Sequence, residues 1–373
     1  MSPSAAVTPP SVAGPLRLEP FRGLMLAAAR VGDPSSARAF ARPYRDVTKR
    51  LDRWEQQGRI LRDPTPAVYL HEYTAGGITV RGIVGALELS LRADSLQDRV
   101  ILPHEGIHPA QASELADRMT QMRLNPAPIL LVHRGPQAAR DLMGEVATSA
   151  PDHEFTDRSQ QHHRVWAIRD AGQLERLATA LAYSRVLIAD GHHRYAAYLR
   201  MQQERPGGPA DRGLAMLVDQ DDTPLFLGAI HRVLVGSTFE DVGSAAAPLG
   251  DFREVSATEA VAALSPDTLV LTDGTHWATL TLTPQVDRAA VEVVHERLIP
   301  ALRSDPRRVA YHHSVDDTLT DLGRTPAVAV LMPAPDYDVV RRILASDRLL
   351  PEKATSFQPK PSLGVLMRSL LDE

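Results

Sequence analysis

The sequence predicts an α+β protein in which a mixed β-sheet core is flanked by antiparallel hairpin segments. Strand-like runs alternate with amphipathic, helix-like runs along most of the chain, as in proteins that combine sheets with helices. Gly-Gly at 76–77 and Asp-Gly at 273–274 separate β-rich runs, and such turns connect antiparallel strands. These hairpins are too frequent for a purely parallel, doubly wound sheet.

The first half of the chain alternates closely between the two kinds of element. The stretch 35–61 is predicted to be mostly helical up to Gly58, because Val47, Leu51 and Trp54 recur at helical spacing among charged residues. Next come a hairpin at 67–89, a short strand at 99–104, an amphipathic helix at 110–124, strands at 126–135 and 162–170, and a helix at 171–184.

The second half begins with a strand that ends at Asp190 and a helix that follows it. Hairpins are predicted at 213–236, with Asp-Asp at the turn, and at 268–284 around Asp-Gly. A helix at 289–303, a strand at 327–335 and a helix from about Tyr337 precede an irregular closing segment.

Composition excludes several classes of function. The 373 residues include 41 Lys and Arg against 46 Asp and Glu, a net charge of -5. A general nucleic-acid-binding protein is usually basic, so a nucleic-acid partner is not expected. The chain has no cysteine, which excludes disulfides, thiolate catalysis and cysteine-ligated zinc.

The N-terminal residues suggest neither a signal peptide nor a membrane anchor. Residues 1–15 are rich in Pro, Ser and Ala and are predicted to form a disordered lead. No window approaches the ~18 uninterrupted apolar residues of a membrane span. We therefore expect a cytoplasmic protein without a membrane partner.

The segment from Arg185 to Met201, RVLIADGHHRYAAYLRM, combines a strand, a tight turn and a helix. The N-terminus of a helix presents unpaired backbone N–H groups and a partial positive charge, which together favour an anion. Gly191 allows a close approach of the backbone, His192, His193 and Arg194 add donors, and Arg can bind phosphate with two hydrogen bonds. Asp190 could cap the helix, orient a histidine or hold Mg²⁺ through water.

Two alternative interpretations of this turn stay open from the residues alone. An ordinary capped helix with solvated basic side chains would use the same residue types. A zinc site built on His192 and His193 is a weaker alternative, because adjacent histidines on a turn rarely face one metal and no second ligand group has zinc-like spacing. No metal can be assigned.

A second constellation, LPHEGIHP, places His104 and Glu105 after a strand and before a helix. A carboxylate beside an imidazole can act as a general base, with the histidine orienting or tuning it. An acidic first turn of a helix would account for the same residues. Both turns follow strands, so we expect them to lie at one end of the same sheet, by analogy with α/β proteins.

The closing segment EKATSFQPKPSLG contains Lys353, Thr355 and Lys360 in a loop bounded by Pro and Gly. Such a loop could close over phosphates, and we expect both lysines to face the same cleft as Arg194; an ordinary solvated loop is the alternative. His231 and Arg232 lie on a predicted strand, where such a pair is more often structural than functional, and they are candidates for a supporting role at the site.

Five motifs together resemble a large bacterial family catalogued as domain of unknown function ten-fifteen. They are PFRGLML, PHEGIHP, ADGHHRYAAYL, IHRVLV and LPEKATSFQPKPSLGVL, in this order along nearly the whole chain. The ADGHHRY turn and the closing KATSFQPK are the specific parts of the resemblance.

Residues from about 98 to 205 are also similar to the ParB/sulfiredoxin superfamily, whose free-serine kinases carry an Asp-Gly-His-His-Arg motif. This resemblance implies a nucleotide-binding core at 98–206, preceded by an α+β segment at 16–97 and followed by a C-terminal α+β domain at 207–373. It implies that Glu105 is the base for a substrate hydroxyl. It also places Asp190, His192, His193 and Arg194 at the phosphates.

The resemblance implies a phosphotransferase that uses ATP or ADP with Mg²⁺ on a small hydroxyl compound, with serine as first choice. Such chemistry depends on positioning and charge neutralisation. A phosphatase acting on phosphoserine-like substrates and a non-catalytic nucleotide-binding switch remain alternatives. The nucleotide, the acceptor and the oligomeric state are unknown at this stage.

Overall fold

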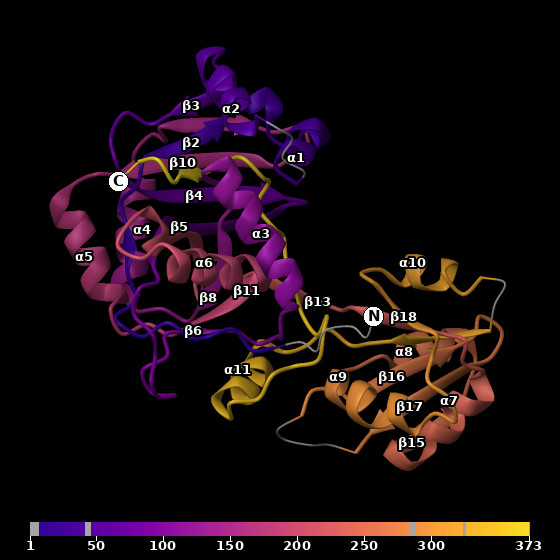
Figure 1. The fold of residues 1–373 in the computed structure, drawn as a ribbon. Coiled ribbons are helices and arrows are strands. Elements are labelled where there is room, and N and C mark those ends of the chain that lie inside the picture. The colour runs from indigo at the N-terminus through magenta and orange to yellow at the C-terminus, as the bar shows by residue number, and fades with distance from the viewer. Residues whose placement is uncertain (1–6, 42–45, 284–287, 324–325, 373) are drawn as a thin grey trace. The chain divides into compact units, whose positions relative to one another are not determined.

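The chain divides into two compact units in a computed structural model that describes residues 7–41, 46–283, 288–323 and 326–372 (Figure 1). The first unit combines residues up to 225 with residues from 359 onward, and the second spans 226–358. These cuts fall at other residues than the boundaries expected near 97 and 206. Each unit is mixed in its secondary structure, and the protein is α+β, as predicted.

The first unit is built around a nine-stranded mixed sheet with the order β6-β11-β8-β12-β5-β4-β10-β9, to which β1 adds at β5. The pairs β6–β11 and β8–β12 are parallel, and the other pairs are antiparallel. The strands are β1 (Leu18–Glu19), β4 (Val68–Ala75), β5 (Ile78–Glu88), β6 (Ile101–Leu102), β8 (Ile129–His133), β9 (His153–Thr156), β10 (His162–Ile168), β11 (Val186–Asp190) and β12 (Arg212–Asp219).

A smaller antiparallel sheet in the same unit has the order β3-β2-β21-β7. Its strands are β2 (Gly23–Leu26), β3 (Ile60–Arg62), β7 (Leu124–Asn125) and β21 (Met367–Ser369). The strand β21 follows the whole of the second unit along the chain, so this sheet joins residues that are far apart in sequence.

The helices of the first unit pack in pairs, α3 with α6 and α4 with α5 (Figure 1). Helix α6 also contacts strands β8 and β12. Pro109 occupies the first position of α3, where a missing N–H costs nothing. The helices are α1 (Pro34–Ala41), α2 (Val47–Gln56), α3 (Pro109–Met122), α4 (Gln137–Ala147), α5 (Ala171–Leu181) and α6 (His192–Glu204).

The second unit contains a six-stranded antiparallel sheet with the order β15-β17-β16-β19-β14-β18, and a separate strand pair, β13–β20. Its strands are β13 (Phe226–Gly228), β14 (His231–Val235), β15 (Gly250–Glu254), β16 (Thr268–Thr272), β17 (Trp277–Leu282), β18 (Arg308–His312), β19 (Ala327–Leu331) and β20 (Ser356–Gln358). The helices are α7 (Phe239–Ala246), α8 (Ala257–Ala263), α9 (Ala290–Val293), α10 (Val315–Thr320) and α11 (Tyr337–Ala345).

The predicted hairpins at 67–89 and 268–284 form as β4–β5 and β16–β17, but the hairpin predicted at 213–236 is wrong. Strand β12 pairs with β5 and β8, whereas β14 pairs with β18 and β19. The run Gly213–Asp219 is buried at every position. A strand buried on both faces belongs in the interior of a sheet, where it has a partner on each side.

Two other segments differ from the sequence expectations. Within the predicted disordered lead, residues from 7 onward contact the first unit: Val12 is buried, and the Tyr195 hydroxyl donates to the Pro10 carbonyl. Helix α4 and strand β9 lie in 136–160, for which no element was predicted. Among the described residues, no helix is both long and apolar enough to cross a membrane.

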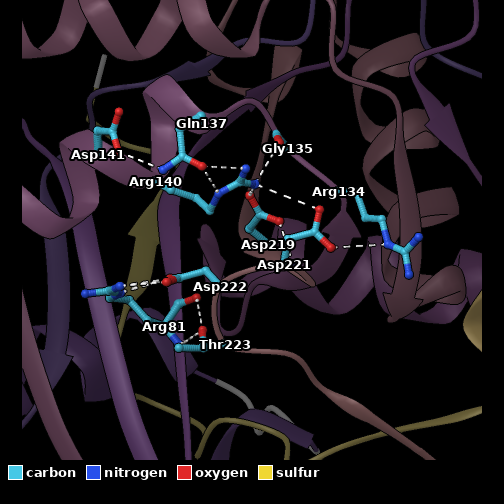
Figure 2. A network of polar contacts seen from close by, with 10 residues as sticks. All are labelled: Arg81, Arg134, Gly135, Gln137, Arg140, Asp141, Asp219, Asp221, Asp222 and Thr223. Carbon is cyan, nitrogen blue, oxygen red and sulfur yellow. Dashed lines mark hydrogen bonds and ion pairs between the residues drawn. The ribbon is translucent and has the colours of Figure 1, made fainter.

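A buried ion pair fixes the carboxyl ends of the parallel strands β8 and β12 (Figure 2). The carboxylate of Asp219, which is 1% exposed, accepts a hydrogen bond of 2.8 Å from Arg140 on α4. The same guanidinium nitrogen donates to the Gly135 carbonyl at 2.8 Å, and the Asp221 N–H donates to Asp219 at 2.9 Å. Arg140 therefore ties the loop after β8 to the turn after β12.

Removing this guanidinium should destabilise the protein strongly. Arg140→Met would leave the buried Asp219 carboxylate without its cation, which costs on the order of 3 kcal/mol. Arg176→Gln, which breaks an exposed pair with Glu145, should cost under about 1 kcal/mol. Urea denaturation of both variants checks the difference, and equal midpoints would contradict the stabilising role of the Arg140–Asp219 ion pair.

Candidate functional site

The parallel pairing of β6 with β11 brings the two predicted turns together. Val186 lies opposite Ile101 and Leu187 opposite Leu102, so both strands end at the same edge of the sheet. The turn at 103–108 follows β6, and the turn at 190–194 follows β11. Their position at one end of one sheet is the arrangement that the sequence predicted.

The two histidines of the DGHHR turn contact the turn that carries Glu105. The His104 N–H donates to His192 Nε2 at 3.4 Å, with the two imidazole rings edge to face. The His108 N–H donates to His193 Nε2 at 3.0 Å, with the two rings stacked. In these bonds Nε2 is the acceptor, so the ring proton of each imidazole is on Nδ1. The histidine pair therefore joins the two turns.

Gly191 is the residue that makes the turn possible. Its φ of 98° lies in the left-handed region, and it is the N-cap of α6. A Cβ atom at this position would lie 3.1 Å from the Arg194 guanidinium, closer than an ordinary contact. Asp190, one residue earlier, does not cap the helix, which was one of its predicted roles.

Asp190 is instead held between two cations. Its carboxylate accepts hydrogen bonds from Arg194 and from Lys360, which lies far along the chain in the closing segment. Burial alone would raise the pKa of this carboxyl, but the charges and hydrogen bonds of Arg194 and Lys360 lower it below 3.8. Arg194 also donates to the Pro128 carbonyl, so three segments meet at the Asp190–Arg194 pair.

A pocket of about 350 Å³ opens beside this cluster. Asp190, Arg194, Lys360 and Ser362 supply its polar groups. Its other walls are largely apolar, formed by Phe40, Pro126, Ala127, Pro128, Leu130, Pro361 and Leu363. A few convergent polar groups on an apolar surface are typical of small-molecule sites.

A group of polar residues that sequence reasoning missed holds the Lys360 segment in place. The Gln161 amide donates to the Lys360 carbonyl at 3.0 Å and accepts from the Ser362 N–H at 3.1 Å. Gln161 is itself bonded through its N–H to the buried Asp157 carboxylate at 2.9 Å. A glutamine in a loop carries no recognisable sequence signal, so only the structure reveals this clamp.

Asp157 continues into a buried chain of imidazoles. It lies 3.1 Å from His163 Nε2, and His163 Nδ1 lies 3.1 Å from His71 Nε2. Burial lowers the pKa of both histidines, so both are neutral at neutral pH. The chain anchors the Gln161 loop to strands β4 and β10.

His104 and Glu105 lie in the turn that follows β6, at the same edge of the sheet as the turn after β11. His104 is fully buried, and its Nε2 is 3.7 Å from the Glu105 carboxylate. Burial lowers the pKa of His104 to about 3, so this imidazole is neutral at neutral pH. It can orient Glu105 but does not carry a proton to a substrate.

The other predicted residues, Lys353, Thr355, His231 and Arg232, belong to the second unit. Arg232 is buried on β14 and donates to the Lys353 carbonyl at 2.8 Å, while His231 Nδ1 accepts from the Met332 N–H at 3.1 Å. The role of Lys353 and Thr355 at the phosphates and a supporting role for His231 and Arg232 stay predictions. Of the two lysines expected beside Arg194, Lys360 contacts Asp190, which is the ion-pair partner of Arg194.

Neither turn forms a ready-made metal cage. Among the described residues, no group of three or more His, Asp or Glu side chains is arranged to hold a metal ion. This is compatible with Mg²⁺, which is usually bound by one or two carboxylates together with substrate phosphates and water.

The fold and site define a mixed-sheet α+β protein with a charged pocket beside the carboxyl end of β11. Residues 18–302 match the family described as "Protein of unknown function (DUF1015)". The chain belongs to this family, as its motifs indicated. No curated protein matches it.

Solved structures show a distant likeness. A C-terminally truncated SbnI from Staphylococcus aureus is 12% identical, with 77% of this chain and 88% of that chain covered and a TM-score of 0.44. A mutant free serine kinase in complex with ADP is 14% identical, with 71% and 89% covered and a TM-score of 0.38. A conserved hypothetical protein from Pyrococcus furiosus is 14% identical, with 71% and 92% covered and a TM-score of 0.35. At these scores the likeness carries no argument about activity.

The neutral histidines predict a loss of stability on acidification. An unfolded imidazole has a pKa near 6.5, whereas buried His104 stays neutral down to a pKa of about 3. The unfolded state therefore binds the extra proton, and the free energy of unfolding falls as the pH drops from about 6.5 towards 3, by up to roughly 1.4 kcal/mol per pH unit for this group. His104→Gln should flatten this slope in urea denaturation at pH 7, 6 and 5.

A control for this comparison is His276→Gln, because His276 is exposed and Asp273 raises its pKa. That substitution should leave the acid limb of the stability curve at least as steep as in the wild type, because protonated His276 can only add stability as the pH falls. An unchanged slope in His104→Gln would contradict the assignment.

The Gln161 clamp predicts a local change in hydrogen exchange. Gln161→Ala removes the acceptor of the Ser362 N–H, so this amide should exchange faster in mass spectrometry or NMR. Gln160→Ala is not a suitable control, because Gln160 has a φ of 62°. Gln173→Ala, at the start of α5, is the matched control and should leave hydrogen exchange in the 359–363 segment unchanged. If the Ser362 amide of Gln161→Ala is as protected as in the wild type, the Gln161 clamp is excluded.

Proposed function

We propose that this protein is a nucleotide-dependent phosphotransferase that moves a phosphoryl group between ATP or ADP and a small hydroxyl compound, with free serine as the first acceptor to test. The observation that carries the proposal is the cluster of Asp190, Arg194 and Lys360 at the start of α6, beside the turn with Glu105. The site brings cations, a helix N-terminus and a carboxylate to one edge of the sheet.

The phosphate end of the site is supported by its charge. The start of α6 contributes a partial positive charge, and Arg194 and Lys360 are held in place by their bonds to Asp190. A guanidinium has five N–H donors, so Arg194 can keep Asp190 and Pro128 and still donate to phosphate oxygens. Asp190 acts as the group that positions both cations.

The pocket beside the cluster supports binding of the rest of the nucleotide. Apolar and proline-rich walls suit the flat face of a base, and the polar groups of the pocket all lie on residues of the phosphate cluster or next to Lys360. In this proposal the base packs against residues such as Phe40 and Leu363, and the phosphates extend towards α6.

Glu105 is the proposed general base for the acceptor hydroxyl. Its side chain is partly exposed, whereas its neighbour His104 is fully buried, so Glu105 is the member of the pair that a substrate can reach. General-base catalysis contributes roughly 10²–10⁴-fold to a rate. Buried His104 and the contact between His104 and His192 would keep Glu105 in position.

Mg²⁺ is the expected cofactor of such a reaction. The side chains that could contribute to its binding are the carboxylates of Asp190 and Glu105, with the phosphates supplying other ligands. When bound, the ion neutralises charge on the transferred phosphoryl group. The same pocket chemistry would serve a phosphatase on phosphoserine-like substrates or a nucleotide-binding switch, so the experiment must separate the three.

The test combines nucleotide binding with turnover. In calorimetry with ADP and Mg²⁺, Arg194→Ala should weaken binding by about tenfold or more, since a charge-assisted hydrogen bond contributes about 1.5–3 kcal/mol. Arg200→Ala, on the same helix but paired with Glu204 at 2.7 Å, should leave the affinity unchanged. Glu105→Gln should keep nucleotide affinity within a few-fold and reduce serine phosphorylation by at least about a hundredfold.

The outcomes separate the candidate functions. Phosphate release from phosphoserine without nucleotide would support the phosphatase instead. Tight nucleotide binding without turnover on a panel of hydroxyl compounds and phosphomonoesters would support the switch. Unchanged ADP affinity in Arg194→Ala would contradict the phosphate site itself, and full turnover in Glu105→Gln would leave Glu105 as an ordinary residue of the turn.

A further inference from the structure

The second unit contains a pocket of its own, about 260 Å³ in volume. It lies at the edge of the six-stranded sheet where β19 ends and where β14 and β16 begin. Met332 to Asp336, directly after β19, form part of its wall, and helix α11 contributes Val339 and Arg342. This pocket is built entirely from residues of the second unit.

Most of the pocket wall is apolar. Ile230, Leu282, Val291, Val293, Met332 and Val339 line it. Of these, Ile230, Leu282, Val291, Val293 and Met332 are buried. Since the share of liquid volume per water molecule is about 30 Å³, the space suits a compact organic molecule that is smaller than a typical drug.

A buried cation forms part of the same wall. Arg232 is 1% exposed, and its guanidinium donates to the carbonyls of Ile230 and Lys353 and to His295 Nε2. His231 and His295 remain neutral at neutral pH, because burial, and then the charge of Arg232, lowers the pKa of each to about 4. The buried wall therefore carries a permanent positive charge next to neutral imidazoles.

The rim of the pocket is close to balanced in charge. Its lining includes two arginines, Arg288 and Arg342, and two aspartates, Asp267 and Asp336. Arg288 is paired with Glu296, whereas Arg342 forms no ion pair with any described residue. Val339 and Arg342 lie one helical turn apart on the same face of α11, and the N-terminus of this helix, capped by Asp336, also lies at the pocket.

We propose that this pocket binds a small organic acid with a single negative charge and a branched or aromatic apolar body, its carboxylate directed towards Arg232 and Arg342. The apolar wall selects the body, and the guanidinium groups of Arg232 and Arg342 select an acid over a neutral molecule of the same shape. This inference does not rest on the proposed phosphotransfer, because it uses none of the residues of the first unit.

The test uses 4-methylpentanoate as the probe and 4-methylpentanamide as its neutral isostere, with the full chain, in saturation-transfer NMR and calorimetry. The acid should bind at least tenfold more tightly than the amide. Arg342→Gln should weaken binding of the acid several-fold without affecting the amide. Arg341→Gln is the matched control, since this neighbour is paired with Asp338 and does not line the pocket.

A second variant tests the pocket by filling it. Val339→Trp fills the pocket and should abolish saturation transfer to the acid, with circular dichroism confirming the fold. Equal binding of acid and amide, stronger binding of phenyl phosphate or of leucine than of the acid, or binding that survives Val339→Trp would each overturn the proposal. ADP affinity should be unchanged in all three variants, which separates this pocket from the first unit.

Discussion

The parallel pairing of two short strands, β6 and β11, is the constraint on which the candidate site depends. It sets the turn that carries Glu105 beside the turn that carries the Asp190–Arg194 pair. Because both strands run the same way and end together, the histidines of one turn bind the backbone of the other. β6 has only two residues, so these side-chain contacts and the packing of α3 on α6 carry much of the stability of the arrangement.

Electrostatics at the site follow from one partly buried carboxylate, that of Asp190. Asp190, at the end of β11, binds Arg194 of the following helix and Lys360 of the closing segment. A carboxylate that holds two cations leaves a net positive charge for an incoming anion while fixing where that charge lies. In the proposed function, charge that is already in place needs no rearrangement when a phosphate binds, which is the condition for effective electrostatic stabilisation.

Local sequence signals were sufficient to predict the elements that depend on a short turn motif. Gly76-Gly77 and Asp273-Gly274 predicted their hairpins, and Gly191 predicted the sharp turn before α6. The pairing of β12 could not be predicted, because its apolar run fits several partners and the choice depends on the whole sheet. The Gln161 clamp and the pocket of the second unit could not be predicted either, since each depends on residues that meet only in the folded chain.

The second unit interrupts the first in sequence, because residues from 359 onward return to the first unit. During synthesis the ribosome therefore finishes the second unit before Lys360, Ser362 and strand β21 emerge. Until then the carboxylate of Asp190 has only one of its two cations, and the small sheet lacks the strand between β2 and β7. In the nascent chain, therefore, the Asp190–Arg194–Lys360 cluster stays incomplete until the second unit has been synthesised.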